Sequence, residues 1–269
     1  MSRLDELFAR CRTENRAALI GYLPVGFPSY DESVEAMLAM VAAGVDLVEV
    51  GVPYTDPGMD GPVIQVAVDA ALRAGSRVAQ VFDAVRAVSE HAPAVVMGYW
   101  NPVEKYGPAR FAKDLKAAGG SGAITPDLIP EEGGPWLEAA RAEDLDPVFL
   151  VAPSSTDERI AVVGRTNRGF VYAASTMGVT GTRAAVGSRA EELVARTRAQ
   201  TDLPVCVGLG VSDGEQAAQV AAYADGVIVG SALVAALRDG GPAAVAVLGR
   251  ELAAGVRRRA PAHPSSSTG

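Results

Sequence analysis

The sequence predicts a single (β/α)8 barrel, the TIM-barrel class, with an extra helix at its N-terminus. Eight short apolar runs recur along the 269 residues, and segments with helix-start signals lie between them. This alternation implies parallel strands joined by helical crossovers. Eight strands favour a closed barrel, and an open doubly wound sheet is the alternative. We expect residues 1–258 to form one barrel domain and the Pro/Ser-rich residues 259–269 to form a disordered tail.

The predicted strands are continuous apolar stretches rather than polar–apolar alternations. Strands covered on both faces have this pattern, because one face meets the barrel lumen and the other meets helices. The fourth run is the weakest. The predicted strands are Ala18–Leu23, Leu47–Val52, Ala94–Tyr99, Gly122–Thr125, Val148–Ala152, Phe170–Ala174, Val205–Leu209 and Gly226–Val229.

Four of the segments between these strands contain a serine followed three residues later by a glutamate. At this spacing the hydroxyl and the carboxylate form a capping box at a helix start. The pattern predicts helix starts at Ser29, Ser155, Ser188 and Ser212. The opening segment, up to about Arg16, is predicted to form the additional amphipathic helix.

Charge and hydropathy exclude several classes of partner. The formal net charge is −8, and an acidic surface repels nucleic acid and anionic membranes. No apolar run is long enough to cross a bilayer, and the charges within MSRLDELFARCRTENR do not fit a secretion signal. We therefore expect a cytoplasmic protein with no nucleic-acid or membrane partner.

The few cysteines and histidines restrict the chemistry. Cys11 and Cys206 are expected to be reduced, buried thiols. His91 precedes a predicted strand and His263 lies in the tail, so neither is well placed for catalysis. Carboxylates or tyrosines are therefore the expected acid–base groups, and no metal site is expected.

Acidic residues gather at the second predicted strand. Glu49 lies inside DLVEVGVP, where a carboxylate must be paired, protonated or functional. A structural ion pair or an exposed edge strand is the alternative. Asp56 and Asp60 follow in PYTDPGMDGP, where aspartates are also common turn formers. In a barrel this loop lies at the C-terminal ends of the strands, where active sites form.

Three glycine clusters occur late in the chain: GVTGTR from Gly178, GLGVSDGE from Gly208, and GVIVGSALVAAL, in which Gly230 and Ser231 open a helix. The last two follow the seventh and eighth predicted strands, where barrels often bind phosphate through backbone amides. Tight turns are the alternative interpretation. Tyr172 ends FVYAA at the same rim, and the long small-residue segment after it is typical of a lid.

These motifs together resemble the tryptophan synthase alpha chain family. The resemblance covers most of the chain, from LDELFARC to the final helix. It is carried by LVEVGVPYTDPGMDGPVIQ, GYWNPVEKYG, GAITPDLIPEE, APSSTDERI, FVYAASTMGVTGTR, GLGVSDGEQA and DGVIVGSAL.

The resemblance implies a retro-aldol cleavage of indole-3-glycerol phosphate to indole and D-glyceraldehyde 3-phosphate, without a cofactor. Glu49 would be the general acid and base, and Asp60 would stay ionised and bind the indole N–H. Tyr172 would lie close to the substrate, and Thr180 would close onto the Asp60 loop. The phosphate contacts it implies are Gly181, Gly210, Gly230 and Ser231, and the indole pocket it implies is lined by Tyr22, Ile64, Met97 and Leu209.

The resemblance also implies an αββα heterotetramer with a β chain that carries pyridoxal phosphate and consumes the indole. The expected contacts are Asp56 and the GYWNPVEKYG segment, where Trp100 and Pro102 would be exposed on a lone subunit. Local packing beneath the loop is the alternative. The chain departs from the family's usual acidic loop at two positions: Thr55 stands where serine is common, and Gly58 stands where a larger residue is common. Both changes affect partner contact and loop closure more than the reaction.

Three other functions remain open from the sequence. The chain could be a free-standing lyase that releases indole, a non-catalytic barrel that binds a ligand and regulates a partner, or a barrel isomerase of a phosphoribosyl compound. The first needs no β chain, the second does not need Glu49 and Asp60, and the third should lack the paired acidic motif.

Overall fold

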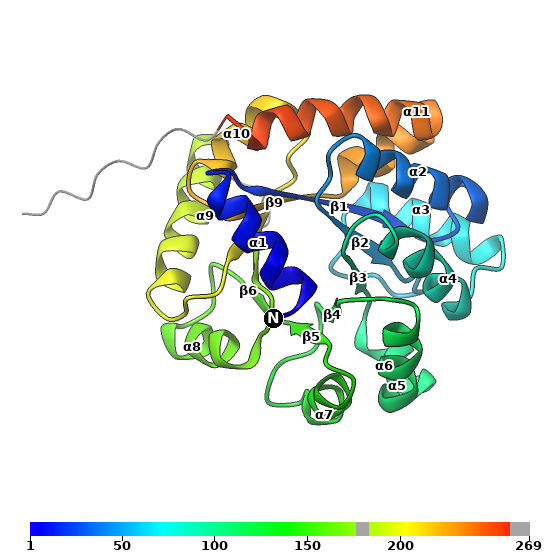
Figure 1. The fold of residues 1–269 in the computed structure, drawn as a ribbon, viewed down its shortest axis with the longest axis horizontal. Helices are drawn as coiled ribbons and strands as arrows, with labels where there is room; N and C mark the ends of the chain where they lie inside the picture. The colour runs from blue at the N-terminus through cyan, green and yellow to red at the C-terminus, as the bar shows by residue number, and fades with distance from the viewer. Residues whose placement is uncertain (176–182, 259–269) are drawn as a thin grey trace, which may run out of the picture.

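A closed parallel barrel forms the centre of the computed structural model, which describes residues 1–175 and 183–258 (Figure 1). The nine strands of the described residues follow the order β5-β4-β3-β2-β1-β9-β8-β7-β6, and every pair is parallel. The first and last of this order, β5 (Asp146–Val148) and β6 (Leu150–Val151), are consecutive along the chain, so the sheet closes on itself. The predicted barrel with an extra N-terminal helix is confirmed.

All eight predicted strands form, and the fifth is interrupted. The Asn167 side chain accepts from the Phe149 amide and donates to the Phe149 carbonyl, both at 3.0 Å, so Phe149, which separates β5 from β6, has a side chain as its backbone partner. The other strands are β1 (Ala18–Pro24), β2 (Leu47–Gly51), β3 (Ala94–Met97), β4 (Gly122–Ile124), β7 (Val171–Ala174), β8 (Val205–Gly208) and β9 (Gly226–Val229).

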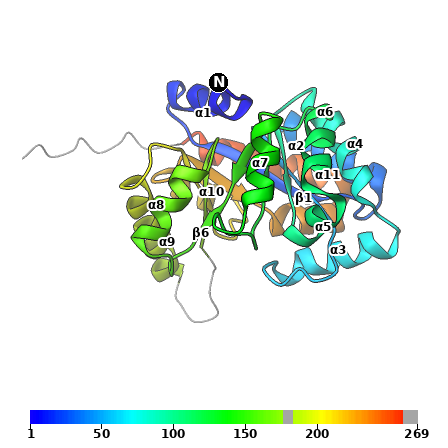
Figure 2. The same cartoon turned by 90° about the horizontal axis from the view of Figure 1, so that it is seen from below.

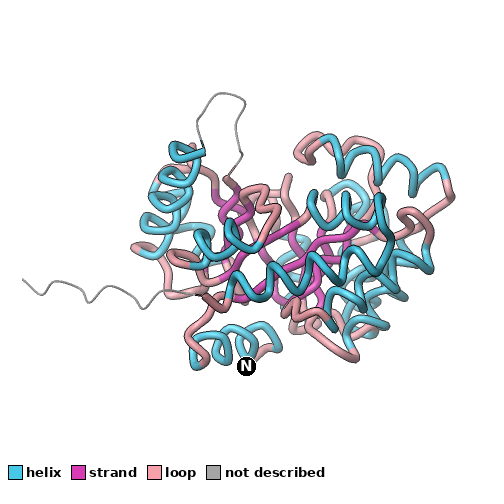
Figure 3. Tube along the Cα trace, turned by 90° about the horizontal axis from the view of Figure 1, so that it is seen from above, coloured by secondary structure: helices cyan, strands magenta, loops and turns pink. Residues whose placement is uncertain are grey.

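Helices surround the strands, as the tube in Figure 3 shows. They are α1 (Arg3–Thr13), α2 (Tyr30–Ala42), α3 (Pro62–Arg73), α4 (Val78–Ser89), α5 (Trp100–Tyr106), α6 (Pro108–Ala117), α7 (Gly134–Ala142), α8 (Asp157–Thr166), α9 (Arg183–Arg198), α10 (Gly214–Ala221) and α11 (Ser231–Val256). A large apolar core lies between this ring of helices and the outer faces of the strands. The predicted tail, residues 259–269, lies outside the described residues.

Only one of the four predicted capping serines caps its helix. Ser29 caps α2 and accepts from the amide of Glu32. The cap of α8 is Thr156 and the cap of α10 is Asp213, each one residue after the predicted serine. Ser155 instead accepts from the amide of Ala152 at the exit of β6. The prediction at Ser188 is wrong because α9 begins at Arg183.

Helix α1 closes the N-terminal end of the lumen. Its buried residues Leu4, Leu7, Phe8 and Cys11 pack against a ring of inward-facing side chains from the strands. The Phe8 and Phe170 rings lie 5.7 Å apart between centroids. The second cysteine, Cys206, belongs to the same cluster, and both thiols are free and buried as expected. Figure 2 shows α1 and α3 at opposite ends of the barrel.

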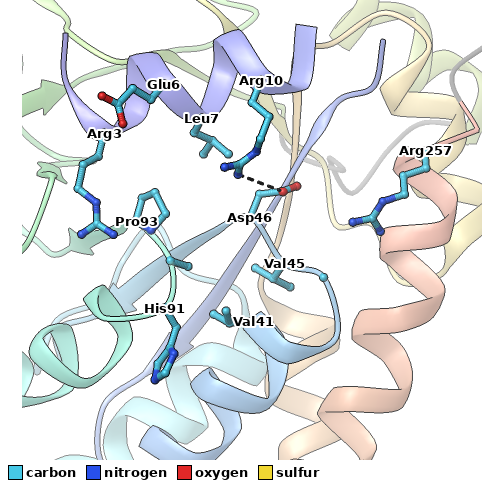
Figure 4. A pocket seen from close by; sticks show the side chains of 12 residues that line it. Arg3, Glu6, Leu7, Arg10, Val41, Val45, Asp46, His91, Pro93 and Arg257 are labelled. Carbon is cyan, nitrogen blue, oxygen red and sulfur yellow. Dashed lines mark ion pairs between the residues drawn. The ribbon is translucent and has the colours of Figure 1, made fainter. Parts of the chain in front are cut away.

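A cavity of about 380 Å³ lies at this N-terminal face, between α1 and the end of α11 (Figure 4). Two of its arginines, Arg3 and Arg10, have structural partners. Arg3 donates to the carbonyl oxygens of Ser89 at 2.9 Å and Gly119 at 3.4 Å, which lie at helix ends. Arg10 lies 4.0 Å from Asp46, which is already bound by the buried Arg16. Cations at helix C-termini offset the helix dipoles, so this cavity is not a candidate catalytic centre.

Helix α11 is long and apolar enough to cross a membrane by length and composition, which is weak evidence by itself. It is broken at Gly241, where φ is +65°, and Pro242 follows. Its buried side chains, including Leu233, Leu237 and Leu252, belong to the core, and the helix packs against α2 and α10. We therefore interpret α11 as an outer helix of the barrel.

Shortening a buried side chain of α1, the helix that closes the lumen, is expected to destabilise the fold. Leu7 is 1% exposed, and Leu7→Ala should lower the free energy of unfolding by about 2–5 kcal/mol, through lost burial and the cavity left behind. Urea unfolding measures the change. Val247→Ala, at an α11 residue that is 59% exposed, is the control and should change stability little. Equal effects of the two variants would show that α1 does not close the barrel.

Candidate active site

Strand pleating places one set of side chains in two successive layers of the lumen. Leu47, Ile20 and Phe170 belong to the lower layer, which contacts α1. Because alternate residues of a strand share a face, the residues two positions later form the next layer toward the C-terminal ends. Those residues include Tyr22, Glu49, Met97, Tyr172 and the glycines at 208 and 230. This upper layer therefore brings together predicted site residues from β1, β2, β3 and β7 with glycines at the ends of β8 and β9.

Glu49 is the most unusual member of this layer. It lies on β2 beside Tyr22 of β1 and Val95 of β3, and it is 1% exposed. Its Oε1 atom has no hydrogen-bond partner among the described residues. Burial raises the pKa of Glu49 to about 8. Glu49 therefore holds a proton at neutral pH and is poised to donate it to a reacting group.

Asp60 occupies a different environment, in the loop between β2 and α3. It is half-buried, and the loop around it is held by backbone bonds from Gly58 to Asp56 (2.8 Å) and from Asp60 to Pro57 (3.0 Å). Burial raises the pKa of Asp60, and a hydrogen bond from Tyr99 lowers it. Unlike Glu49, Asp60 thus has a donor that favours its ionised form.

Two tyrosines flank the carboxylates from opposite sides of the lumen. The Tyr22 hydroxyl lies so close to Gly51 that a Cβ added there would be 2.6 Å from it, and Tyr172 lies equally close to Gly208. Burial, followed by the charges of Asp60 and Glu49, raises the pKa of both tyrosines well above the ordinary value. Both hydroxyls therefore stay protonated, and each can donate a hydrogen bond.

Apolar side chains surround the same space. Met97 ends β3, and Leu209 follows β8 and is 9% exposed. Ile64, on the first turn of α3, lies near Gly230, where an added Cβ would be 3.5 Å from the Ile64 Cδ1 atom. These residues and Tyr22 form an apolar wall beside the two carboxyls.

The glycine clusters place backbone amides at the rim. Gly210 has a φ of +70°, a conformation that favours glycine. Gly230 is the N-cap of α11 and provides no side-chain cap, and Ser231 is the first helical residue. Free amides at such a helix start attract anions. A Cβ on Gly61 would lie 3.8 Å from the Ser231 hydroxyl, so the start of α11 adjoins the Asp60 loop.

Two predicted residues, Thr180 and Gly181, lie outside the described residues, together with the rest of segment 176–182 of the predicted lid. From Arg183 on, the segment predicted as a lid forms helix α9. Within residues 1–175 and 183–258, no group of three or more histidine, cysteine or acidic side chains is arranged to hold a metal ion.

The expected partner surface needs one correction. Asp56 is exposed, and its side chain accepts a hydrogen bond from Thr55. Trp100 and Pro102 were expected to be exposed, but both are half-buried, and Trp100 packs against the main core. The alternative of local packing beneath the loop fits the two residues better. A side chain at Gly58 would meet nothing within 4 Å, so the loop has room there.

Sequence reasoning did not single out Tyr99, although it ends the predicted strand 94–99 at the active-site rim. Its hydroxyl accepts a hydrogen bond from the Met59 amide at 3.0 Å. The position of a polar aromatic residue at a strand end, opposite an acidic loop, was the available signal.

Comparisons with known proteins agree with this geometry. The family model described as tryptophan synthase alpha chain matches residues 8–256. The chain is 61% identical to the tryptophan synthase alpha chain of Mycobacterium avium (strain 104), over 97% of both chains. A tryptophan synthase structure from M. tuberculosis superposes with a TM-score of 0.90 at 56% identity, over 96% of this chain and 99% of that one. The alpha subunit from Legionella pneumophila str. Paris gives 0.87 at 30% identity, over 95% and 98%.

Removing the buried carboxyl should stabilise the fold at alkaline pH. Unfolded Glu49 ionises near pH 4.5 and folded Glu49 near pH 8. Between these values the folded chain holds a proton that the unfolded chain has released, so wild-type stability falls as pH rises and levels off above about pH 8. The Glu49→Gln variant does not lose stability in this way. Its free energy of unfolding relative to the wild type should therefore increase through this pH window, toward a limit of roughly 5 kcal/mol.

Urea unfolding of both proteins across this pH window measures the gain. The control is Glu138→Gln on the exposed face of α7, which should change stability little. A stability gain for Glu49→Gln that is the same at both ends of the window would contradict a raised Glu49 pKa.

Proposed function

This chain belongs to the tryptophan synthase alpha chain family, and on that premise we propose how its site cleaves indole-3-glycerol phosphate to indole and D-glyceraldehyde 3-phosphate. The chain is a carbon–carbon lyase of tryptophan biosynthesis. The observation that supports the mechanism best is the pair of unequal carboxyls: Glu49 is buried and unpartnered, whereas Asp60 has a hydrogen-bond donor.

Glu49 moves the protons of the retro-aldol reaction. Its protonated carboxyl donates to C3 of the indole ring, which leaves a positive charge on the ring nitrogen. The resulting carboxylate accepts the proton of the glycerol hydroxyl next to C3. As the aldehyde forms, the carbon–carbon bond breaks and its electron pair returns to the ring. Glu49 ends the cycle protonated, so its elevated pKa suits both steps.

Asp60 stabilises the charge between these steps. Its carboxylate accepts a hydrogen bond from the indole N–H, and that bond strengthens as the nitrogen becomes positive. Tyr22, Ile64, Met97 and Leu209 hold the ring, and Tyr172 lies beside it. The phosphate binds the amides around Gly210 and Gly230 and the Ser231 hydroxyl, with Gly181 as a further contact. Thr180 closes onto the Asp60 loop.

The partner in this proposal is a tryptophan synthase β chain, in an αββα heterotetramer. Pyridoxal phosphate belongs to the β chain, and the alpha chain uses no cofactor. Asp56, which is exposed, belongs to the contact surface. Residues 1–258 form one domain, and the protein works in the cytoplasm without nucleic-acid or membrane partners.

Turnover of indole-3-glycerol phosphate tests the reaction and its two carboxyls. The wild-type chain should release indole slowly alone and faster with an added β chain. Glu49→Gln should lower kcat by about 1000-fold or more, because the proton donor and acceptor is lost. Asp60→Asn should lower kcat by about 100-fold or more, because the charge on the ring nitrogen loses its partner.

Glu138→Gln is the matched control and should retain wild-type turnover. Full activity without stimulation by the β chain would instead identify a free-standing lyase. Unchanged turnover of Glu49→Gln would refute the acid–base role.

The exposed Asp56 carboxylate provides a test of the partner surface. Asp56→Ala should weaken binding of the β chain by about tenfold without changing the fold, as expected for an exposed contact residue. Isothermal titration calorimetry with purified β chain measures the affinity. The control is Asp202→Ala. Asp202 is exposed and lies before β8, at the opposite end of the barrel, so this variant should bind the β chain with wild-type affinity. Equal affinities for all three proteins would place the contact elsewhere.

A further inference from the structure

Tyr99 joins the acidic loop after β2 to the start of α5. Its hydroxyl accepts the Met59 N–H at 3.0 Å, and it lowers the pKa of the carboxyl of Asp60, the next residue. A single hydroxyl thus acts on the backbone and the side chain of two successive loop residues. The Met59 bond ties the loop backbone to Tyr99 and places Asp60 beside the same hydroxyl.

Tyr99 is itself held firmly. It is 7% exposed and is the N-cap of α5. Its ring lies 5.3 Å from the Tyr54 ring, between centroids, and the Tyr54 hydroxyl accepts from Asn101 at 3.0 Å. The next amide, that of Trp100, donates to the Asp127 carboxylate at 2.8 Å. Burial, the Tyr54 ring and the anchored start of α5 therefore restrict where the hydroxyl lies.

We propose that Tyr99 is the positioning residue of Asp60, and that the start of α5 sets the orientation of the Asp60 carboxylate through it. The role rests on the proposed function, in which Asp60 must be ionised and aimed at the indole N–H. A contact that shifts the start of α5 moves the Tyr99 hydroxyl, and the Asp60 loop moves with it.

The electrostatics of the site give this hydrogen bond its importance. Besides Tyr99, the titratable groups that face Asp60 are Tyr22 of β1 and Tyr172 of β7, and Glu49 of β2 shares the lumen with them. No cation among the described residues offsets the burial of Asp60, so burial raises its pKa and the Tyr99 bond opposes that rise. In this proposal the tyrosine thus favours the ionised form of the carboxyl as well as orienting it.

Tyr99→Phe tests the proposal, because it removes the hydroxyl and keeps the ring. The Asp60 pKa should rise in the variant, which carbon-13 NMR titration of aspartate carboxyls in the isolated chain measures, with the Asp60 signal assigned by Asp60→Asn. In turnover with the β chain, kcat should fall about tenfold. Activity should also begin to fail at a higher pH on the acidic side, because Asp60 is protonated sooner.

Tyr106→Phe is the matched control. The Tyr106 hydroxyl bonds Asp114 at 2.6 Å, at the other end of α5, so its removal should leave the Asp60 pKa and the acidic limb unchanged. In an Asp60→Asn background, Tyr99→Phe should have little further effect on kcat. An unchanged Asp60 pKa in Tyr99→Phe overturns the proposal. The NMR titration needs no turnover, so a wild-type chain without lyase activity would refute the proposed function and leave this test intact.

Discussion

The alternation of side chains along closed parallel strands is the constraint on which this structure depends. A residue on each strand faces either the lumen or the helices, and its neighbour faces the other side. On β2, Val48 and Val50 therefore join the outer core, while Leu47 joins the lower lumen layer and Glu49 the upper one. The same two-residue step places Tyr22 above Ile20 and Tyr172 above Phe170. An apolar layer sealed by α1 thus supports a polar layer that can do chemistry.

The two carboxyls differ because the fold gives them different surroundings. Glu49 is in the wall of the barrel, where neighbouring strands exclude water and provide no donor to Oε1. Asp60 is on a loop, where water and the Tyr99 hydroxyl both reach it. Burial raises the pKa of both carboxyls, but only Asp60 has a donor that opposes the rise. The barrel and its loop thus separate the roles of two chemically similar groups.

Sequence patterns predicted what depends on local hydropathy and missed what depends on contacts between distant residues. The eight apolar runs identified the barrel, since burial on both faces leaves a clear pattern. The break at Phe149 could not be predicted, because it depends on Asn167, which comes 18 residues later. Two helix caps shifted by one residue because Ser155–Thr156 and Ser212–Asp213 each offer adjacent capping side chains. The partial burial of Trp100 and the bonds of Tyr99 likewise depend on packing between segments, whereas Glu49 stood out because a charge inside an apolar strand is rare.

The plug formed by α1 makes the lumen a dead end. With that end closed, the proposed reaction requires substrate and products to pass at the C-terminal ends of the strands. A subunit that covers this opening consequently controls arrival and departure together. An apolar product released under such a cover meets the covering subunit before it meets bulk water, so sealing one end of a barrel is what makes directional transfer from the other end possible.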